Sequence, residues 1–192
     1  HPIVIDRAIA DFGKGIALIA QQLESFLSES DVQMLEDRAA RFEAEGAPKV
    51  LARRIADLAL LAPACDVVRI AHDSGLPVET VARTYFTVGK TFGFDWLRRA
   101  AGQLSTDTAW DKLAVTAIVD DFLGHQSELT ARVLDGKTAK ADVDSSIEGW
   151  AVQRRPLILR SEQLVQELKA AGTLDLAMLA VANRQLKSMV AG

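Results

Sequence analysis

The sequence is poor in the residues from which most catalytic and metal sites are built. Its 192 residues include one cysteine, three histidines and one tyrosine. A single cysteine, Cys65, excludes an intramolecular disulfide. Cys65 follows the small residues at 62–64 and has no activating histidine beside it, so we interpret it as a small buried residue rather than a catalytic thiol.

Long apolar runs are also missing. No run approaches the roughly 20 residues that a membrane-spanning helix needs. The short apolar start at 2–5 leads directly into Asp6 and Arg7, which is not the pattern of a signal peptide. The net charge of −4 disfavours a broad nucleic-acid surface. We therefore expect a cytoplasmic protein that contacts neither membrane nor nucleic acid. Because His1 stands where an initiator methionine is usual, we expect a processed chain or a piece of a longer one.

No segment sustains the period-two alternation of a strand. Apolar residues instead recur at spacings of three and four, which is the helical period. This predicts an all-α, multi-helix fold of about eight to ten helices without a sheet. The clearest repeat opens the chain, at Ile5, Ile9, Phe12, Ile16, Ile19, Leu23 and Phe26.

Turn residues predict where the helices begin and end. Ser28 is expected to cap a helix that Gly46 ends, and Pro48 to open one that stops before Pro63. Later helices are expected at 64–74, 77–91, 94–103 and 107–134, followed by one that Pro156 kinks or breaks and a final pair joined across Gly172. We expect a single helical domain over 1–192, with the polar segment 135–146 as a loop or inner boundary.

Two local patterns resemble ligand sites only superficially. The run GKG at 13–15 lacks the rest of a dinucleotide or phosphate loop and lies inside a helical period. Asp121 and His125 share a helix face, with Asp120 beside them, but a third metal ligand is not evident. Because His125 falls in the apolar stripe of that helix, we interpret it as a core histidine. Trp96, Trp110 and Trp150 are interpreted as anchors of helix packing.

The segment 66–91 has the form of a helix-turn-helix, with a glycine turn at Gly75. If it bound DNA, the helix at 77–91 would enter the major groove. Its face is poor in phosphate ligands, so we favour a packing unit and keep DNA binding as the alternative. The side chains that would contact DNA are Glu79, Thr80, Arg83, Thr84 and Thr87.

The segment 35–104 resembles the C-terminal helical region of the large bacterial NAD-specific glutamate dehydrogenases. The resemblance is carried by an ordered series of short motifs and is weaker past Asp135. The motifs are EGAP at 45–48, LARRIA at 51–56, DVV at 66–68, GLPVE at 75–79, VARTYF at 81–86 and GFDWL at 93–97.

This resemblance implies an accessory domain of an enzyme that oxidises L-glutamate to 2-oxoglutarate and ammonia with NAD. The sequence contains no G-x-G-x-x-G fingerprint and no βαβ pattern, so NAD is expected to bind upstream in a longer chain. We assign no catalytic, cofactor-binding or metal-binding residue here. The expected partners are the catalytic domain of the same polypeptide and further copies of the subunit. An independent enzyme with its own metal or cofactor is a third interpretation.

The expected role of this region is structural or regulatory. The apolar face of the first helix, at Ile9, Phe12 and Ile16, is predicted to be partly exposed and to drive self-association. The residues expected to carry the packing are Leu58, Ile70, Val81, Tyr85, Phe86, Phe94, Trp96 and Leu97.

Overall fold

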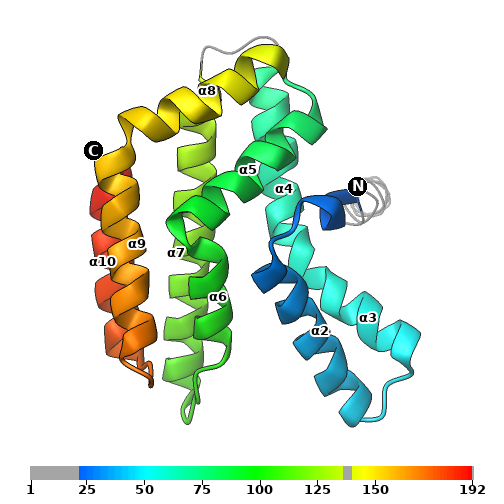
Figure 1. The fold of residues 1–192 in the computed structure, drawn as a ribbon. Coiled ribbons are helices and arrows are strands. Elements are labelled where there is room, and N and C mark those ends of the chain that lie inside the picture. The colour runs from blue at the N-terminus through cyan, green and yellow to red at the C-terminus, as the bar shows by residue number, and fades with distance from the viewer. Residues whose placement is uncertain (1–21, 136–139, 192) are drawn as a thin grey trace, which may run out of the picture. The chain divides into compact units, whose positions relative to one another are not determined.

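The computed structural model describes residues 22–135 and 140–191 (Figure 1). Every regular element in these ranges is a helix and none is a strand, which confirms the expected all-α fold. The described residues form two compact units that divide between Arg69 and Ile70, within α4 (Leu61–Ser74). The single-domain organisation with an inner boundary near 135–146 stays a prediction. The GKG run and the apolar face of the first helix lie outside the described residues.

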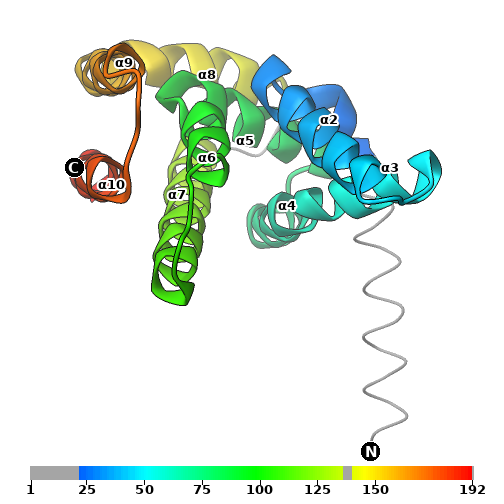
Figure 2. The same cartoon turned by 90° about the horizontal axis from the view of Figure 1, so that it is seen from below.

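The first unit is built around two paired helices, α2 (Glu29–Ala44) and α3 (Lys49–Asp57), which lie side by side in Figures 1 and 2. A 3-10 turn, η1 (Glu24–Phe26), precedes them. Ser28 caps α2 as predicted, because its hydroxyl accepts a hydrogen bond from the backbone N–H of Asp31 at 3.1 Å. Gly46, at a φ of 98°, turns the chain into α3.

Arg53 connects α3 to η1 within this unit. Its Nε donates to Asp57 at 2.7 Å and its Nη2 donates to Glu24 at 2.9 Å. The hydrogen bond to Asp57 is the main cause that raises the pKa of the Arg53 guanidinium above its ordinary value, and desolvation opposes it. Since these side chains are partly exposed, we treat the cluster as positioning η1 rather than as a large source of stability.

The path from α3 to α4 differs from the prediction. The third helix ends at Asp57, a 3-10 turn η2 (Leu58–Leu60) follows, and α4 begins before Pro63. Proline is tolerated in the first turn of a helix, so Pro63 does not delay the start of α4. The prediction that Leu58 packs inside was wrong: it is 56% exposed, whereas Leu60 is 2% exposed. The buried stripe passes from Ala52 and Ala56 to the next position four residues on, which is Leu60.

The prediction that Cys65 is buried was also wrong, because its side chain is exposed. Its neighbours Ala64 and Val67 are each 0% exposed. A helix turns by about 100° per residue, so position 65 faces outward when 64 and 67 face inward.

The second unit packs its helices around α7 (Ala109–Leu134). This helix contacts α5 (Val78–Phe92), α6 (Phe94–Gly102), α8 (Lys140–Gln153) and α10 (Leu176–Ala191). Figure 1 shows α9 (Arg155–Ala170) beside α10, and Figure 2 shows α6 lying along α7. The long helix is thus the scaffold on which the other elements of this unit are ordered.

Most joints of the second unit lie where the sequence predicted them. Gly75, Gly93 and Gly172 all have positive φ, between 69° and 75°, a region that favours glycine. Pro156 lies in the first turn of α9, so the chain breaks there as expected. The start of α7 is set by a capping box in which Thr108 and Asp111 satisfy each other's backbone N–H groups. In contrast, α8 begins at Lys140, inside the segment expected to be a loop.

The core of the second unit contains a chain of aromatic rings. Phe92 and Phe94 stack with ring centroids 6.0 Å apart, and Phe94 lies 6.3 Å from Phe122. All three side chains are at most 1% exposed. Trp96 is only partly buried but packs against this core. The expected packing role is confirmed for Ile70, Val81, Tyr85, Phe86, Phe94, Trp96 and Leu97.

Candidate functional site

A buried glutamine joins three helices of the second unit. Gln126 on α7 is 0% exposed, and its Nε2 donates to the carbonyl oxygen of Tyr85 on α5 at 2.8 Å. Its Oε1 accepts a hydrogen bond from Arg98 on α6. Gly89 permits this approach, because a Cβ at that position would lie 2.5 Å from Nε2. The amide is engaged at both ends, which suits a structural contact rather than a reacting group.

A second buried contact joins α9 to the end of α5. The hydroxyl of Ser161, which is 0% exposed, donates to the carbonyl oxygen of Phe92 at 2.8 Å. That carbonyl belongs to the last turn of α5, where carbonyl groups lack partners within the helix. Ser161 therefore fixes α9 against the joint between α5 and α6.

The candidate metal ligands on α7 meet an asparagine of α10 instead. Nδ2 of Asn183 donates to Asp121 at 2.6 Å, and Oδ1 of Asn183 lies 3.1 Å from Nε2 of His125. Because an amide oxygen can only accept, Nε2 of His125 must carry the hydrogen in this arrangement. His125 is 9% exposed, which confirms its interpretation as a core histidine. Within the described ranges, no group of three or more His, Cys, Asp or Glu side chains is arranged to hold a metal ion.

Replacing Asn183 with alanine should lower the free energy of unfolding by about 1–2 kcal/mol, because His125 and Asp121 both lose a hydrogen-bond partner across the α7–α10 contact. Urea denaturation of the variant measures the change. Arg184→Ala is the matched control, since Arg184 is exposed and should shift stability by less than about 0.5 kcal/mol. Equal effects of the two substitutions would contradict a structural role for Asn183.

The helix-turn-helix segment forms two helices joined at Gly75, but its predicted DNA-contacting face is partly hidden. Thr80 is 3% exposed, and Thr84 is 0% exposed with its hydroxyl donating to the Thr80 carbonyl oxygen at 3.0 Å. Arg83 pairs with Glu79 at 3.4 Å. Base contacts require side chains that reach out of the protein. The burial of Thr80 and Thr84 therefore favours the packing interpretation of α5.

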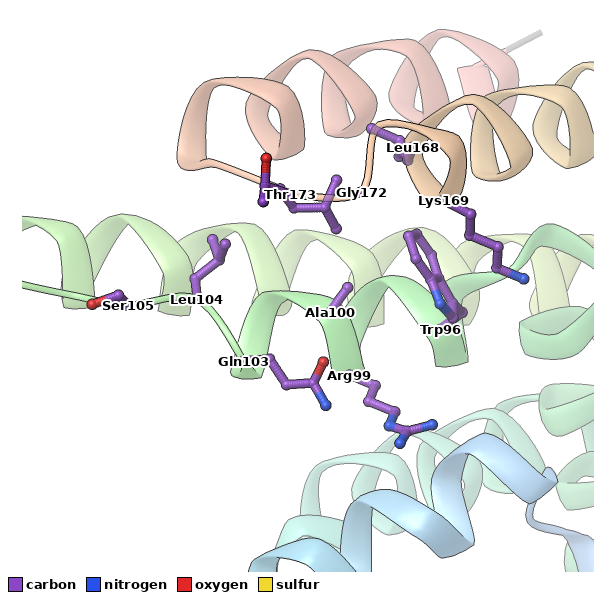
Figure 3. A pocket seen from close by; sticks show the side chains of 11 residues that line it. Trp96, Arg99, Ala100, Gln103, Leu104, Ser105, Leu168, Lys169, Gly172 and Thr173 are labelled. Carbon is purple, nitrogen blue, oxygen red and sulfur yellow. The ribbon is translucent and has the colours of Figure 1, made fainter.

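A groove of about 500 Å³ lies between α6 and the turn that joins α9 to α10. Figure 3 shows Trp96 on the side of α6 that faces Gly172, and Leu104 on the loop that follows this helix. The ammonium group of Lys169 lies 5.2 Å from the centroid of the Trp96 ring, within range of a cation–π contact. The lining residues are Trp96, Arg99, Ala100, Gln103, Leu104, Ser105, Leu168, Lys169, Gly172, Thr173 and Leu174.

The groove has the chemistry of a binding surface. Its lining contains no Asp, Glu, His or Cys, so it offers neither a general base near neutral pH nor a thiol nucleophile. It does offer apolar surface, an indole and the ammonium group of Lys169. Sequence reasoning missed this site because Trp96 and Lys169 are distant in the chain, and only the return of α9 to α6 brings them together.

Trp110 departs from the packing role expected of it. It is 79% exposed, and Leu113, one turn along α7, is 60% exposed. Both lie near the start of α7 and precede Ile118, which is the first buried residue of this helix. No helix described in the structure combines the length and the hydrophobicity needed to cross a membrane.

A family model and individual relatives both relate this chain to glutamate dehydrogenases. A family model described as "Glutamate dehydrogenase, C-terminal" matches residues 1–188. The NAD-specific glutamate dehydrogenase of Pseudomonas aeruginosa is 30% identical over 183 residues, which cover 95% of this chain and 11% of that protein. The protein of the same name from Mycobacterium tuberculosis is 28% identical over 189 residues, which cover 98% of this chain and 12% of that protein. The chain thus spans only about a ninth of the length of these relatives.

Proposed function

Because the chain belongs to the family of C-terminal regions of glutamate dehydrogenases, we propose that it is a non-catalytic helical domain of a large NAD-dependent glutamate dehydrogenase. The whole enzyme would convert L-glutamate and NAD to 2-oxoglutarate, ammonia and NADH. One observation carries this proposal: the family match covers 1–188, whereas the chain spans only 11% of the Pseudomonas relative. Most of such an enzyme therefore lies outside these residues.

The chemistry of the reaction supports the division of roles. Dinucleotide-binding folds hold NAD at the edge of a parallel sheet, beside a glycine-rich turn. The described part of this chain consists of helices and loops, and the sequence contains no G-x-G-x-x-G run. On this proposal the rest of the polypeptide binds NAD and glutamate, and this region contributes no catalytic, cofactor or metal residue.

The internal contacts support a structural role. Gln126 and Ser161 connect helices through buried hydrogen bonds, and such satisfied polar contacts specify one arrangement of a core. A second unit whose helices are fixed to one another in this way suits a domain that supports other parts of an enzyme. We propose that its partners are the catalytic part of the same polypeptide and neighbouring subunits, and that it contacts neither nucleic acid nor membrane.

The 192-residue chain should show no binding of NAD in isothermal titration calorimetry and no formation of NADH from glutamate, because the proposal places both sites elsewhere in the polypeptide. The full-length Pseudomonas enzyme, titrated under the same conditions, is the positive control. A dissociation constant in the micromolar range for the chain alone, about −8 kcal/mol of binding free energy, would overturn the proposal.

A further inference from the structure

We propose that the groove between α6 and the α9–α10 turn is the docking site for an acidic segment with an apolar side chain, supplied by the rest of the glutamate dehydrogenase polypeptide. This inference rests on the function proposed above and names one surface through which the domain would contact the enzyme. The groove is built wholly from residues of the second unit, between Trp96 and Leu174.

The shape of the groove suits a side chain or a short stretch of peptide. Its volume of about 500 Å³ falls within the range of pockets that hold ligands. Apolar side chains contribute much of its wall, and the Trp96 ring stands in it (Figure 3). Tryptophan is over-represented among residues that dominate binding energy at interfaces. Leu104, Leu168 and Leu174 add apolar surface around the ring.

The charge at the groove favours an acidic occupant. Lys169 lines it and no Asp or Glu does, although the chain as a whole carries a net charge of −4. Figure 3 shows the Lys169 ammonium beside Trp96 at the edge of the groove, whereas the Arg99 side chain points away from Gly172 on the opposite side of α6. Rim charges steer a partner of opposite sign and set its register. An apolar side chain in the groove with a carboxylate at the rim would match both features.

The size of the groove favours an occupant in the same polypeptide. Two free proteins usually bury about 1,200–2,000 Å² in a stable complex, far more than one such groove provides. A segment of the same chain binds at an effective concentration that reaches the millimolar range, so a small contact suffices. The relatives supply such a segment in principle, because the match covers only 11% and 12% of their length.

Photo-crosslinking in the full-length enzyme that contains this chain tests the proposal. Ser105 is exposed and lines the groove, so Ser105→p-benzoylphenylalanine places the probe there. Gln185 is exposed on α10 and does not line the groove, so the same replacement at Gln185 is the control. We expect mass spectrometry to find a crosslink from position 105 to a peptide outside residues 1–192 that contains Asp or Glu, and none from position 185 to that peptide. Crosslinks from 105 only within these residues, only to a second copy, or to no peptide would overturn the proposal.

Charge reversal tests the acidic character of the occupant. Lys169→Glu should lower the yield of the crosslink from position 105 about tenfold, which corresponds to about 1.4 kcal/mol of docking free energy. Lys187→Glu makes the same change in charge at an exposed position of α10 away from the groove, and should leave the yield unchanged. Equal yields in the two variants would overturn the proposal. NAD binding by the 192-residue chain would instead refute the proposed function, so the two failures are distinguishable.

Discussion

Replacing Gly93 with alanine should lower the free energy of unfolding by about 3 kcal/mol. Gly93 joins α5 to α6 at a φ of 70°, a conformation that costs an L residue roughly 1–2 kcal/mol. A Cβ there would also lie 2.8 Å from Cγ2 of Val165, which is closer than real Cβ contacts come. Valine is stiff about χ1 and Val165 is 6% exposed, so its methyl group cannot move aside freely. Urea denaturation measures the loss.

Gly172→Ala separates the cost of backbone strain from the cost of the close contact with Val165. Gly172 has a similar φ of 75°, but a Cβ at that position would meet nothing within 4 Å. Its replacement should therefore cost only the backbone strain, roughly 1–2 kcal/mol. In a Val165→Ala background, Gly93→Ala should fall toward the same value. If Gly93→Ala is no more destabilising than Gly172→Ala in the parent, the close contact with Val165 contributes nothing.

Replacing Gln126 with leucine should cost about 3 kcal/mol, because two buried hydrogen bonds are lost together. One is accepted from the charged Arg98 side chain, and the other is donated to the Tyr85 carbonyl oxygen at 2.8 Å. Arg98 is 8% exposed, so water cannot readily replace the acceptor that it loses. Chemical denaturation measures the effect. Gln185→Leu, at an exposed position of α10, should change stability by less than about 0.5 kcal/mol.

A double-mutant cycle of Gly89 and Gln126 tests how closely α5 and α7 approach at this contact. Alanine is favoured over glycine within a helix by about 1 kcal/mol, but at Gly89 the added Cβ would meet Nε2 of Gln126 at 2.5 Å. Gly89→Ala should therefore destabilise the protein, whereas Gly124→Ala, with nothing within 4 Å, should stabilise it. In a Gln126→Ala background the cost of Gly89→Ala should largely disappear. Strict additivity of the two changes would show that the side chains do not meet.

Three residues that were expected to be buried or to anchor packing are exposed, all for the same reason. Leu58, Cys65 and Trp110 are residue types that are often buried or used as anchors, and each is exposed here. An apolar residue is buried only if another element covers its face, and the sequence does not say which faces are covered. His125 was placed correctly because it shares a stripe with Ile118 and Phe122, whose spacing itself indicates a buried face.

The groove likewise could not be predicted from the sequence. Trp96 could be identified in the sequence as an aromatic residue near the start of a helix, but nothing local predicts that Lys169 lies 5.2 Å from its ring. The family resemblance was accessible because it depends on the order of short motifs between 45 and 97, which needs no contacts. The family match over 1–188 confirms it and extends it past Asp135.

The sequence by itself determined the helical class, most of the joints and the family of this protein. Those properties follow from apolar spacing and from residues such as Gly93 and Pro156, whose own backbone restrictions act locally. Only the tertiary structure decided which side chains are buried, how Gln126 and Ser161 satisfy distant backbone carbonyls, and that a groove beside Trp96 lies between α6 and the α9–α10 turn. These depend on contacts between residues far apart in the chain, whose geometry is set by the packing of whole helices.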